Sequence, residues 1–456
     1  MGNCQPGQEQ PNAGAGPTIK RQHSATTEKV RNAARSSAMR RASSGEAPPI
    51  PRSKVFRSAS GGTYDYDPSL DFIKNRNYYS VQMTSKHTFT VDIRYQKLKR
   101  IGSGAYGIVC SAVDQVTGMK VAIKKVGDVF ADLVDAKRIL REIRILTHLS
   151  PHKNIVGLLD VMVGPKPVAD FKDLYLVFEL FDGDLDRAVG LPQLTAAHIQ
   201  YFLYQILKGM LYVHSAGIIH RDLKPPNILI NSNNDLSICD FGLARGVGDV
   251  SQGPEDEEEE PSTEYTEYVV TRWYRAPELL CGNSHYDDKI DVWSIGLIFA
   301  ELLIGKTVLR GQNYLDQLRK SMSLVGKPND EGLGFVESKA ARKAIMRMDF
   351  AETGKIDSIF KGYHPLAVDL LKKMLMFDPR KRISVADALE HPYFAKLRGE
   401  MDVVSEPLCD KVFDASFEAA YPLDKEMPKR KMQSFFLEAV RQLTSPDRVF
   451  HGGGVR

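Results

Sequence analysis

The sequence predicts an α+β protein with two lobes, a small sheet lobe followed by a larger, mainly helical lobe. Three observations predict this fold. Between residues 95 and 180, short apolar runs of strand length surround a single helical pattern. The stretch 181–184, which contains Asp and Gly, interrupts the pattern and suits a hinge. Beyond it, apolar residues recur at helical spacing as far as Phe394.

The first lobe is expected to hold a five-stranded antiparallel sheet and one helix. The helix is predicted over 133–149, because its apolar residues recur at helical spacing. The strands are predicted at residues 95–101, 108–113, 120–126, 156–163 and 174–180. In the second lobe, the apolar run 292–304 is too short to span a bilayer and predicts a helix buried on all sides.

The positive charge of the chain is concentrated at its N-terminal end. The whole chain has a formal net charge of +4, with 61 Lys and Arg against 57 Asp and Glu. The first sixty residues hold ten basic and three acidic side chains, which leaves 51 and 54 for the rest. A nearly neutral body argues against a general nucleic-acid binder. The five scattered cysteines form no C-x-x-C pair, which is typical of a reduced intracellular protein without a disulfide framework or zinc site.

Residues 1–60 are expected to form a disordered basic tail, because they hold few large apolar side chains to offset the entropy of ordering. Near its start, Gly2 is a candidate for myristoylation and Cys4 for palmitoylation. Pro6 stands where the usual pattern has Ser or Thr, so a plain disordered start is the alternative. Acylation together with the basic residues would supply the two signals that stable membrane binding needs.

A glycine-rich stretch between the first two predicted strands indicates a nucleotide-binding turn. Glycines at 102, 104 and 107 allow the backbone to approach phosphates closely. Because the chain continues after Val109 as a strand and not a helix, the pattern predicts a lid over ATP, not a dinucleotide fold. The residues expected to contact ATP here are Ile101, Gly102, Ser103, Gly104, Ala105, Tyr106, Gly107, Ile108 and Val109.

The next strand selects one of two adjacent lysines for the phosphates. Side chains alternate along a strand, so Ala122, which suits a site against adenine, shares a face with Lys124. Lys125 then points to the opposite face and is expected to be solvated. Glu142 lies near the apolar face of the predicted helix, where a carboxylate is costly unless paired, so Lys124 is its expected partner. A solvated pair of Glu142 with Arg138 is the alternative.

Residues 219–245 carry two motifs that together predict phosphoryl transfer. His220-Arg221-Asp222 is followed by Asn227 at the spacing H-R-D-L-x-x-x-N. Asp240-Phe241-Gly242 comes after a short predicted hairpin. In such a set, one carboxylate faces a substrate hydroxyl, while an amide and a second carboxylate hold Mg²⁺ against the nucleotide phosphates.

The order of these motifs resembles a eukaryotic protein kinase, because Ala276-Pro277-Glu278 follows them as the end of an activation loop. Thr266-Glu267-Tyr268 lies shortly before it, an arrangement similar to a MAP kinase of the extracellular-signal-regulated type. Tyr314-Leu315-Asp316-Gln317-Leu318 and His391-Pro392-Tyr393 also match that family. The resemblance covers about residues 89–440 and implies a bilobal protein kinase fold.

The resemblance implies a role for each matching residue. Asp222 would orient a substrate Ser or Thr and accept its proton, and Lys224 would stabilise the transferring phosphate. Asn227 and Asp240 would hold Mg²⁺. Adenine would be contacted by the gatekeeper Phe178, by Glu179 to Phe181 and by Leu229.

The resemblance also implies a phosphorylation switch. An upstream dual-specificity kinase would phosphorylate Thr266 and Tyr268, and the phosphates would order the loop through charge-assisted pairs with arginines. The expected arginines are Arg141, Arg221 and Arg245 for phosphothreonine, and Arg272 and Arg275 for phosphotyrosine. The segment Val269-Val270 would favour proline after the target residue.

The expected activation loop departs from the family pattern in two ways. A second Thr-Glu-Tyr stands at 263–265, but the spacing to Ala276-Pro277-Glu278 selects Thr266 and Tyr268. The loop is also long and contains six acids at 255–260, which normally indicate a solvated, mobile segment. One hypothesis is that these acids compete weakly for Arg141 and Arg245 before phosphorylation.

The patch that would grip basic peptides of partner proteins is expected to be thin. Asp402 and Glu406 are the candidate docking acids, and Ser405 stands where a further acid is common. Other partners implied by the resemblance are an upstream MAP kinase kinase, proteins with Ser/Thr-Pro sites and phosphatases, with no direct nucleic-acid contact. Cytoplasmic localisation is expected, with the nucleus left open and a membrane-associated fraction if Gly2 or Cys4 is acylated.

The predicted organisation is a tail at 1–60, a partly ordered lead-in at 61–94, a kinase domain at 95–394 and an extension at 395–456 that packs back on it. Within the kinase domain, the N-lobe would span 95–180, the hinge 179–183 and the C-lobe 184–394. One alternative is a catalytically silent scaffold with a membrane-recruited tail. The four residues that such proteins tend to lose are all present, namely Lys124, Asp222, Asn227 and Asp240. A cyclin-dependent-type kinase is disfavoured, since that class has no Thr-x-Tyr at this register.

Overall fold

The computed structural model describes residues 55–57, 63–65, 76–85, 87–104, 107–164, 171–246, 272–349, 354–400, 406–419 and 427–444. The chain divides into two compact units, residues 1–68 and 69–456. In the first unit, strands β1 (Val55–Arg57) and β2 (Thr63–Asp65) pair antiparallel. Several residues singled out from the sequence lie outside the described residues, namely Gly2, Cys4, Ala105, Tyr106, Thr266, Tyr268, Asp402 and the acidic run 255–260.

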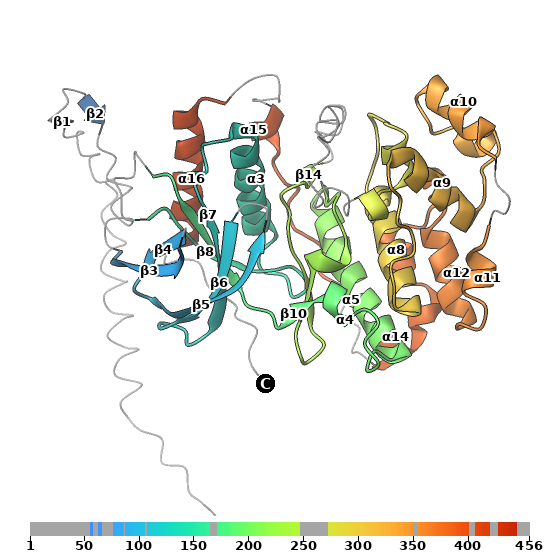
Figure 1. Ribbon diagram of the computed structural model, residues 1–456, viewed down its shortest axis with the longest axis horizontal. Coiled ribbons are helices and arrows are strands. Elements are labelled where there is room, and N and C mark those ends of the chain that lie inside the picture. Colours follow the sequence, from blue (N-terminus) through green and yellow to red (C-terminus); the bar gives the residue numbers. More distant parts are fainter. Residues whose placement is uncertain are drawn as a thin grey trace, which may run out of the picture. The chain divides into compact units, whose positions relative to one another are not determined.

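The second unit contains a five-stranded sheet in which all neighbouring strands are antiparallel (Figure 1). Its strands, in the spatial order β5-β6-β7-β9-β8, are β5 (Tyr95–Gly104), β6 (Gly107–Asp114), β7 (Lys120–Val126), β9 (Leu174–Glu179) and β8 (Leu158–Met162). Buried and half-buried side chains alternate along β6, as a strand with one face on a core requires. The predicted small sheet lobe is confirmed.

Helix α3 (Leu133–Leu149) packs beside this sheet and has the predicted bounds. Asp132 caps its N-terminus by accepting hydrogen bonds from the backbone N–H groups of Val134 (2.7 Å) and Asp135 (3.1 Å). Ile139, Leu140 and other apolar residues of the helix are buried in the core. Glu142 is buried on the same helix and belongs to the site described below.

A hairpin that the sequence patterns did not predict as strands lies before the sheet. It consists of β3 (Tyr78–Thr84) and β4 (His87–Asp92), which pair antiparallel. The Phe89 ring makes an edge contact with Tyr175 of β9, at 5.7 Å between centroids. Lys125 donates from Nζ to the Thr88 carbonyl at 2.8 Å and pairs with Asp173 at 2.6 Å. The prediction that Lys125 is solvated is therefore wrong, because this hairpin covers the outer face of the sheet.

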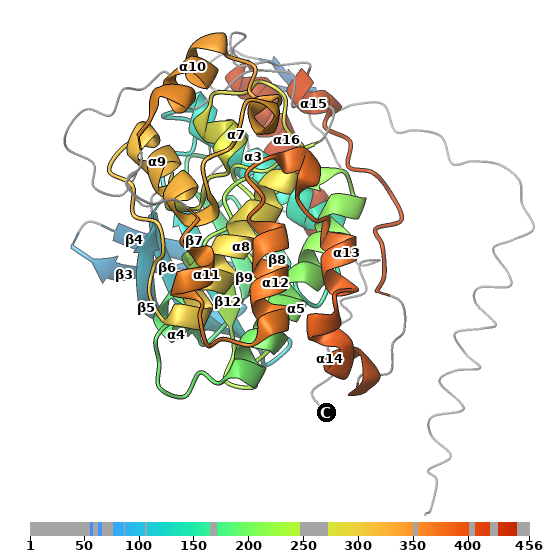
Figure 2. The same ribbon diagram turned by 90° about the vertical axis from the view of Figure 1, so that its right-hand side faces the viewer.

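The helical lobe follows the sheet and confirms the predicted α+β architecture (Figures 1 and 2). Its helices are α4 (Leu185–Ala188), α5 (Ala196–Ser215), η3 (Pro225–Asn227), η5 (Arg272–Tyr274), α7 (Pro277–Leu280), α8 (Lys289–Ile304), α9 (Tyr314–Val325), η6 (Glu331–Leu333), α10 (Lys339–Arg347), α11 (Ile356–Ile359), α12 (Pro365–Met374), η7 (Pro379–Lys381), α13 (Val385–Leu389), η8 (Pro392–Phe394) and α14 (Ala395–Glu400). Its short strands are β10 (Gly183–Asp184), β11 (Ile218–Ile219), β12 (Ile228–Ile230), β13 (Leu236–Ile238) and β14 (Arg245–Gly246).

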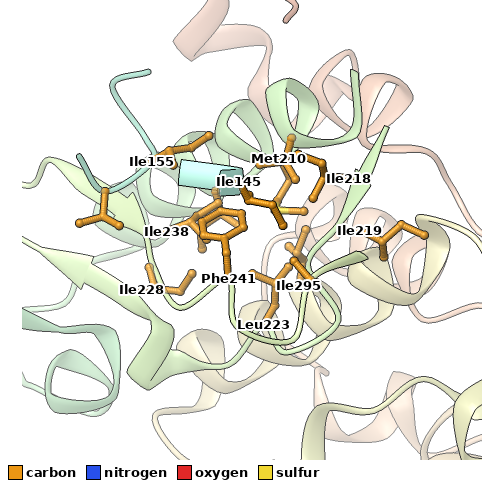
Figure 3. Packing of buried hydrophobic residues seen from close by; sticks show 14 of the residues in the cluster. Ile145, Ile155, Met210, Ile218, Ile219, Leu223, Ile228, Ile238, Phe241 and Ile295 are labelled. Carbon is orange, nitrogen blue, oxygen red and sulfur yellow. The ribbon is translucent and has the colours of Figure 1, made fainter. Parts of the chain in front are cut away.

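Helix α8 is the centre of this lobe. Its residues are buried from Ile290 to Leu302, and α5 and α12 pack against it. The sequence predicted this helix at the apolar run 292–304, and in the structure the helix begins at Lys289. Figure 3 shows how Ile295 of α8, Met210 of α5 and Phe241 meet in one continuous apolar core.

The chain returns to the first lobe near its C-terminal end. Helices α15 (Ser416–Ala419) and α16 (Lys429–Thr444) follow the helical lobe, and α16 packs against α3 and β8 (Figure 1). Both helices belong to the segment 395–456 that the sequence predicted as a C-terminal extension. None of the helices in the described residues is long and apolar enough to cross a membrane.

Candidate active site

The loop that carries His220, Arg221 and Asp222, called the catalytic loop below, begins where β11 ends. A buried carboxylate from α8 fixes its first turn. Asp291 accepts hydrogen bonds from the backbone N–H groups of His220 (2.8 Å) and Arg221 (2.9 Å). It also contacts Nε2 of His214 at 2.9 Å. Arg221 has a φ of +70°, a conformation that costs free energy for a residue with a side chain, so the turn needs such an anchor. Sequence reasoning missed Asp291, although an acid at the start of a buried apolar helix is an unusual signal.

Asp222 follows that turn and is held by two neighbours from its own loop. Lys224 donates from Nζ to Asp222 Oδ2 at 2.8 Å. Asn227 donates from Nδ2 to the Asp222 carbonyl at 2.9 Å and to its Oδ2 at 3.2 Å. Burial raises the pKa of Asp222, and the charge of Lys224 opposes that rise. With Oδ2 engaged twice, Oδ1 is the atom left to receive a proton from a substrate hydroxyl.

The second acid, Asp240, lies beside the loop because a hairpin folds back on it. In that hairpin Ile228 of β12 is opposite Ile238 of β13, and Cys239 donates its backbone N–H to the Asn227 carbonyl at 3.0 Å. Asp240 has a φ of +65°, a second strained position in the same site. The charge of Asp240 also contributes to the raised pKa of Asp222, which agrees with their proximity.

Phe241 fixes the position of Asp240 from the side of the core. Its ring is fully buried and lies 4.7 Å from the His220 ring, measured between centroids. His220 in turn contacts the Cys239 carbonyl through Nε2 at 3.1 Å. The two predicted motifs are therefore brought together, and the buried Phe241 joins them to the core seen in Figure 3.

The residues that the resemblance assigned to a metal fit a hard divalent cation. Asn227 uses Nδ2 as a donor toward Asp222, so its Oδ1 is the atom that can bind a cation. Asp240 adds a carboxylate from the neighbouring hairpin. Carboxylate and carbonyl oxygens are the ligands that Mg²⁺ prefers.

The predicted pair between Lys124 and Glu142 is present. Lys124 Nζ lies 3.2 Å from Glu142 Oε2, and the two side chains are 19% and 5% exposed. Burial raises the pKa of Glu142, and the adjacent ammonium group of Lys124 opposes that rise. The alternative pair with Arg138 is wrong, because Arg138 contacts Asp135 instead, at 3.2 Å.

The glycine-rich hairpin is formed by the end of β5 and the start of β6, where Val109 is opposite Lys124 in the pairing of β6 with β7. Gly102 is opposite Val109 in the register of the two strands. A Cβ at Gly107 would lie 2.0 Å from the Lys125 carbonyl oxygen, so only glycine fits there. The side chain of Ile108 is buried with Cys110 and with Phe89 of β4, on the sheet face that the β3–β4 hairpin covers.

The other expected ATP contacts come from both lobes, on the five-stranded sheet and on the β10-β12-β13 sheet. Ala122 is opposite Phe178 in the pairing of β7 with β9. Leu229 pairs with Asp184 where β12 meets β10. The carboxylate of Glu179 instead packs toward Gly157, where an added Cβ would be 2.8 Å from Oε1, and burial raises its pKa.

Phe181 is half-buried and packs against the main core. Ile101, Gly102 and Ser103 lie on β5, and Ile101 is 46% exposed. Of these residues, Phe181 lies in the segment 179–183, where the sequence placed the hinge.

Three arginines from different parts of the chain meet at the segment that follows Phe241. Arg141 donates to the Gly242 carbonyl at 3.0 Å, Arg221 to the Leu243 carbonyl at 3.4 Å and Arg245 to the Ala244 carbonyl at 3.3 Å. These are the arginines that the resemblance assigned to phosphothreonine. Arg141 and Arg245 are 2% and 7% exposed, so little of either side chain is accessible to the acids that were hypothesised to compete for them.

The second arginine group meets at Tyr314. The guanidinium carbons of Arg272 and Arg275 lie 5.2 Å and 5.6 Å from the centre of its ring, and Arg275 Nη1 donates to its hydroxyl at 3.0 Å. Arg272 also donates to the Gln312 carbonyl at 2.9 Å. These contacts attach the chain after the expected activation loop to α9.

Two further ion pairs bear on sequence expectations. Glu278 of the Ala276-Pro277-Glu278 motif forms a bidentate pair with Arg382, at 2.7 Å and 3.0 Å, and both side chains are buried. Glu406, a candidate docking acid, pairs with Lys208 of α5. Its charge is therefore already matched within the chain, which thins the candidate docking patch further.

The comparisons with known proteins agree with this geometry. A model of the protein kinase domain matches residues 95–394. The chain is 48% identical over 325 residues to mitogen-activated protein kinase 4 of Oryza sativa subsp. japonica, which covers 71% of this chain and 84% of that protein. It is 47% identical over 325 residues to mitogen-activated protein kinase 7 of Arabidopsis thaliana, with the same shares of 71% and 84%. To mitogen-activated protein kinase 14 of Xenopus laevis it is 43% identical over 357 residues, covering 78% of this chain and 93% of that one.

Proposed function

The chain belongs to the protein kinase family and is a mitogen-activated protein kinase, and we propose that Asp222 is the residue through which it phosphorylates Ser/Thr-Pro sites in proteins. It is an ATP-dependent serine/threonine kinase that uses a divalent metal ion. The observation that carries the proposal is the arrangement of Lys224 and Asn227 on one oxygen of Asp222, at 2.8 Å and 3.2 Å.

The proposed proton transfer follows from that arrangement. Asp222 Oδ1 accepts a hydrogen bond from the substrate hydroxyl and takes its proton as the oxygen attacks the γ-phosphorus. The raised pKa of Asp222 favours this step, because a more basic carboxylate receives a proton more readily. Lys224 stays bound to Oδ2 and stabilises the charge of the transferring phosphoryl group.

Lys124 is proposed to orient the nucleotide. Its contact with Glu142 holds the ammonium group over the cleft, where it binds phosphate oxygens of ATP. Asn227 and Asp240 would hold Mg²⁺, which when bound neutralises charge on the phosphates.

The test is transfer of labelled phosphate from ATP to a Ser-Pro peptide by the full chain. We expect Asp222→Asn and Lys124→Met each to reduce the rate by at least roughly 100-fold, since each removes a directly acting group. Lys120→Met is the matched control, because Lys120 is exposed on the same strand as Lys124. Full activity of Asp222→Asn would contradict the assignment, and an inactive wild type after loop phosphorylation would favour a silent scaffold.

Activation is proposed to depend on phosphorylation of Thr266 and Tyr268 by an upstream kinase. The convergence of Arg141, Arg221 and Arg245 on one backbone segment supports this, because a phosphate added nearby would gain charge-assisted hydrogen bonds. Thr266→Ala should abolish activation while Thr263→Ala leaves it intact. The reverse result would select the first Thr-Glu-Tyr as the switch.

The chain interacts with an upstream kinase, protein substrates and phosphatases, as its relatives' family does. We further propose that acylation of Gly2 and Cys4 brings a fraction of a cytoplasmic protein to membranes, with the nucleus as a second compartment. The Met1-Gly2-Asn3-Cys4 start and the basic tail support this proposal. Intact mass of the N-terminal peptide from cells tests it, and an unmodified Gly2 would remove the anchor.

A further inference from the structure

A short stretch of the C-terminal extension contacts both lobes. On the side of the helical lobe, Cys409 donates its N–H to Ser215 Oγ and Phe413 donates its N–H to the Ala216 carbonyl, both at 2.8 Å. On the side of the sheet lobe, Nε2 of His148 lies 2.9 Å from the Lys411 carbonyl. The stretch therefore connects the end of α5 to the end of α3.

The next part of the extension covers the outer face of α3. The guanidinium carbon of Arg144 lies 4.2 Å from the ring centre of Phe417 in α15 and 5.7 Å from that of Phe435 in α16. The two rings also meet each other, at 6.5 Å between centroids. A cation between two aromatic rings is attracted by both, and partial burial strengthens the attraction.

Neighbours of Arg144 on the same helix contact residues of the candidate active site. Glu142 contacts Lys124 at 3.2 Å, and Arg141 donates to the Gly242 carbonyl at 3.0 Å. Two residues along an α-helix correspond to a rotation of about 200°. Arg144 and Glu142 therefore hold α3 from nearly opposite sides, one through the extension and the other through the cleft.

The contacts on the helical lobe are equally close to the catalytic machinery. Ala216, whose carbonyl accepts the bond from Phe413, is followed by β11 (Ile218–Ile219) and then by the catalytic loop. The extension thus bridges the helix that carries Glu142 and the chain that leads into Asp222.

We propose that Arg144 is a positioning residue for phosphoryl transfer, which stacks on Phe417 and Phe435 and thereby keeps Glu142 within reach of Lys124. The proposal rests on the function proposed above, since it assigns Lys124 to the nucleotide. Loss of the cation leaves α3 in place within the fold but allows Glu142 to move away from Lys124, which weakens nucleotide binding first.

The test uses the full chain in two backgrounds. In the active protein, Arg144→Met should reduce kcat/KM for ATP by roughly threefold to tenfold, because methionine keeps the apolar stem and removes the cation. KM for the protein substrate should stay the same, and Arg144→Lys should recover most of the loss. Arg138→Met is the control on the same helix, because Arg138 contacts Asp135 and is expected to change kcat/KM less than about twofold.

The second background separates this inference from the proposed function. In Asp222→Asn, binding of a non-hydrolysable ATP analogue should weaken by the same factor when Arg144→Met is added, whatever the residual activity. Phe417→Leu should reproduce the loss, and the double variant with Arg144→Met should lose no more than either single variant. A lower thermal midpoint with unchanged analogue affinity and unchanged kcat/KM would overturn the proposal and leave Arg144 as a packing residue only.

Discussion

Helix α8 carries a buried carboxylate near each end, and the two are held in different ways. Asp291 in the first turn is 1% exposed and accepts from two backbone N–H groups as well as contacting His214. Glu301 near the last turn is 3% exposed and accepts from the Tyr274 hydroxyl at 2.6 Å and the Thr307 hydroxyl at 3.1 Å. One site has two backbone N–H groups and an imidazole, and the other has two hydroxyl groups.

The difference is visible in the direction of each pKa shift. Burial alone would raise the pKa of Asp291, but the hydrogen bond and charge of His214 and the backbone N–H of His220 hold it below its usual range. Burial raises the pKa of Glu301, and the bonds from Tyr274 and Thr307 only partly offset it. The helix dipole acts in the same directions, because it favours a negative charge in the first turn and disfavours one in the last.

The comparison shows that similar burial gives two different supports for one active site. Asp291 holds the strained turn at Arg221 as an ionised group, so the catalytic loop depends on a buried charge. Glu301 holds Tyr274, which ends the helical turn after the expected activation loop, and it does so in an environment that favours the neutral acid. Removing the charge of Asp291 is therefore expected to lower the free energy of unfolding strongly, and removing the charge of Glu301 is expected to change it little.

Replacing Asp291 should have the largest effect. Asp291→Asn removes the charge and leaves at least one of its donors unsatisfied in the core, which should lower the free energy of unfolding by about 3 kcal/mol. The turn at Arg221 would relax and move Asp222, so kcat should fall by roughly 10- to 100-fold. Chemical denaturation and steady-state kinetics of the purified full chain measure the two effects.

Asp288→Asn is the matched control for this variant. Asp288 lies 3.4 Å from Nδ1 of the same His214, but its side chain is 38% exposed. An exposed pair contributes little, so unfolding should change by less than about 1 kcal/mol. Equal losses in the two variants would contradict the role given to Asp291.

Asp291 also shows where sequence reasoning ended. The strand alternation around Lys124, the helical spacing of 133–149 and the spacing of the two catalytic motifs are local, and they predicted the sheet, α3 and the pairing with Glu142. Asp291 contacts a loop 70 residues away in the chain. No periodicity connects two such positions, so a local pattern could not identify the contact.

The same limit explains the error at Lys125. Strand alternation placed Lys125 on the face opposite Lys124, but only the β3–β4 hairpin decides what covers that face. The same hairpin also covers Ile108, whose side chain alternates with that of Val109 and is buried on that face. The glycines of the motif allow close approach of the backbone, whereas the side chains of their neighbours alternate between the two faces of the sheet, as in any strand.

Acid titration of stability should sharpen the comparison, because the two carboxylates act in separate pH ranges. The folded pKa of Asp291 is lowered, so its contribution is complete above the unfolded value of about 3.9 and is lost as pH falls through the folded pKa. The folded pKa of Glu301 is raised, so its contribution is complete below about 4.3 and is lost as pH rises through the folded pKa.

The measurement compares the free energy of unfolding of wild type and each variant from pH 3 to pH 7. The difference between wild type and Asp291→Asn should be constant down to about pH 4 and shrink below it. The difference between wild type and Glu301→Gln should instead move in favour of wild type as pH falls from 7 toward about 4.3. Parallel curves for the two variants would show that both carboxylates ionise alike and would remove the contrast.

Replacing Glu301 by its neutral analogue should have the smallest effect at neutral pH. Glu301→Gln keeps an oxygen that accepts the hydrogen bond from Tyr274 and removes a charge that burial already disfavours. The free energy of unfolding should therefore change by less than about 1 kcal/mol, and kcat should stay within about twofold. Glu301→Ala, which also removes the acceptor, should cost about 1–3 kcal/mol, because the Tyr274 hydroxyl is then buried without a partner. If glutamine were as costly as alanine, the charge of Glu301 and not its hydrogen bonds would support Tyr274, and the two ends of α8 would work in the same way.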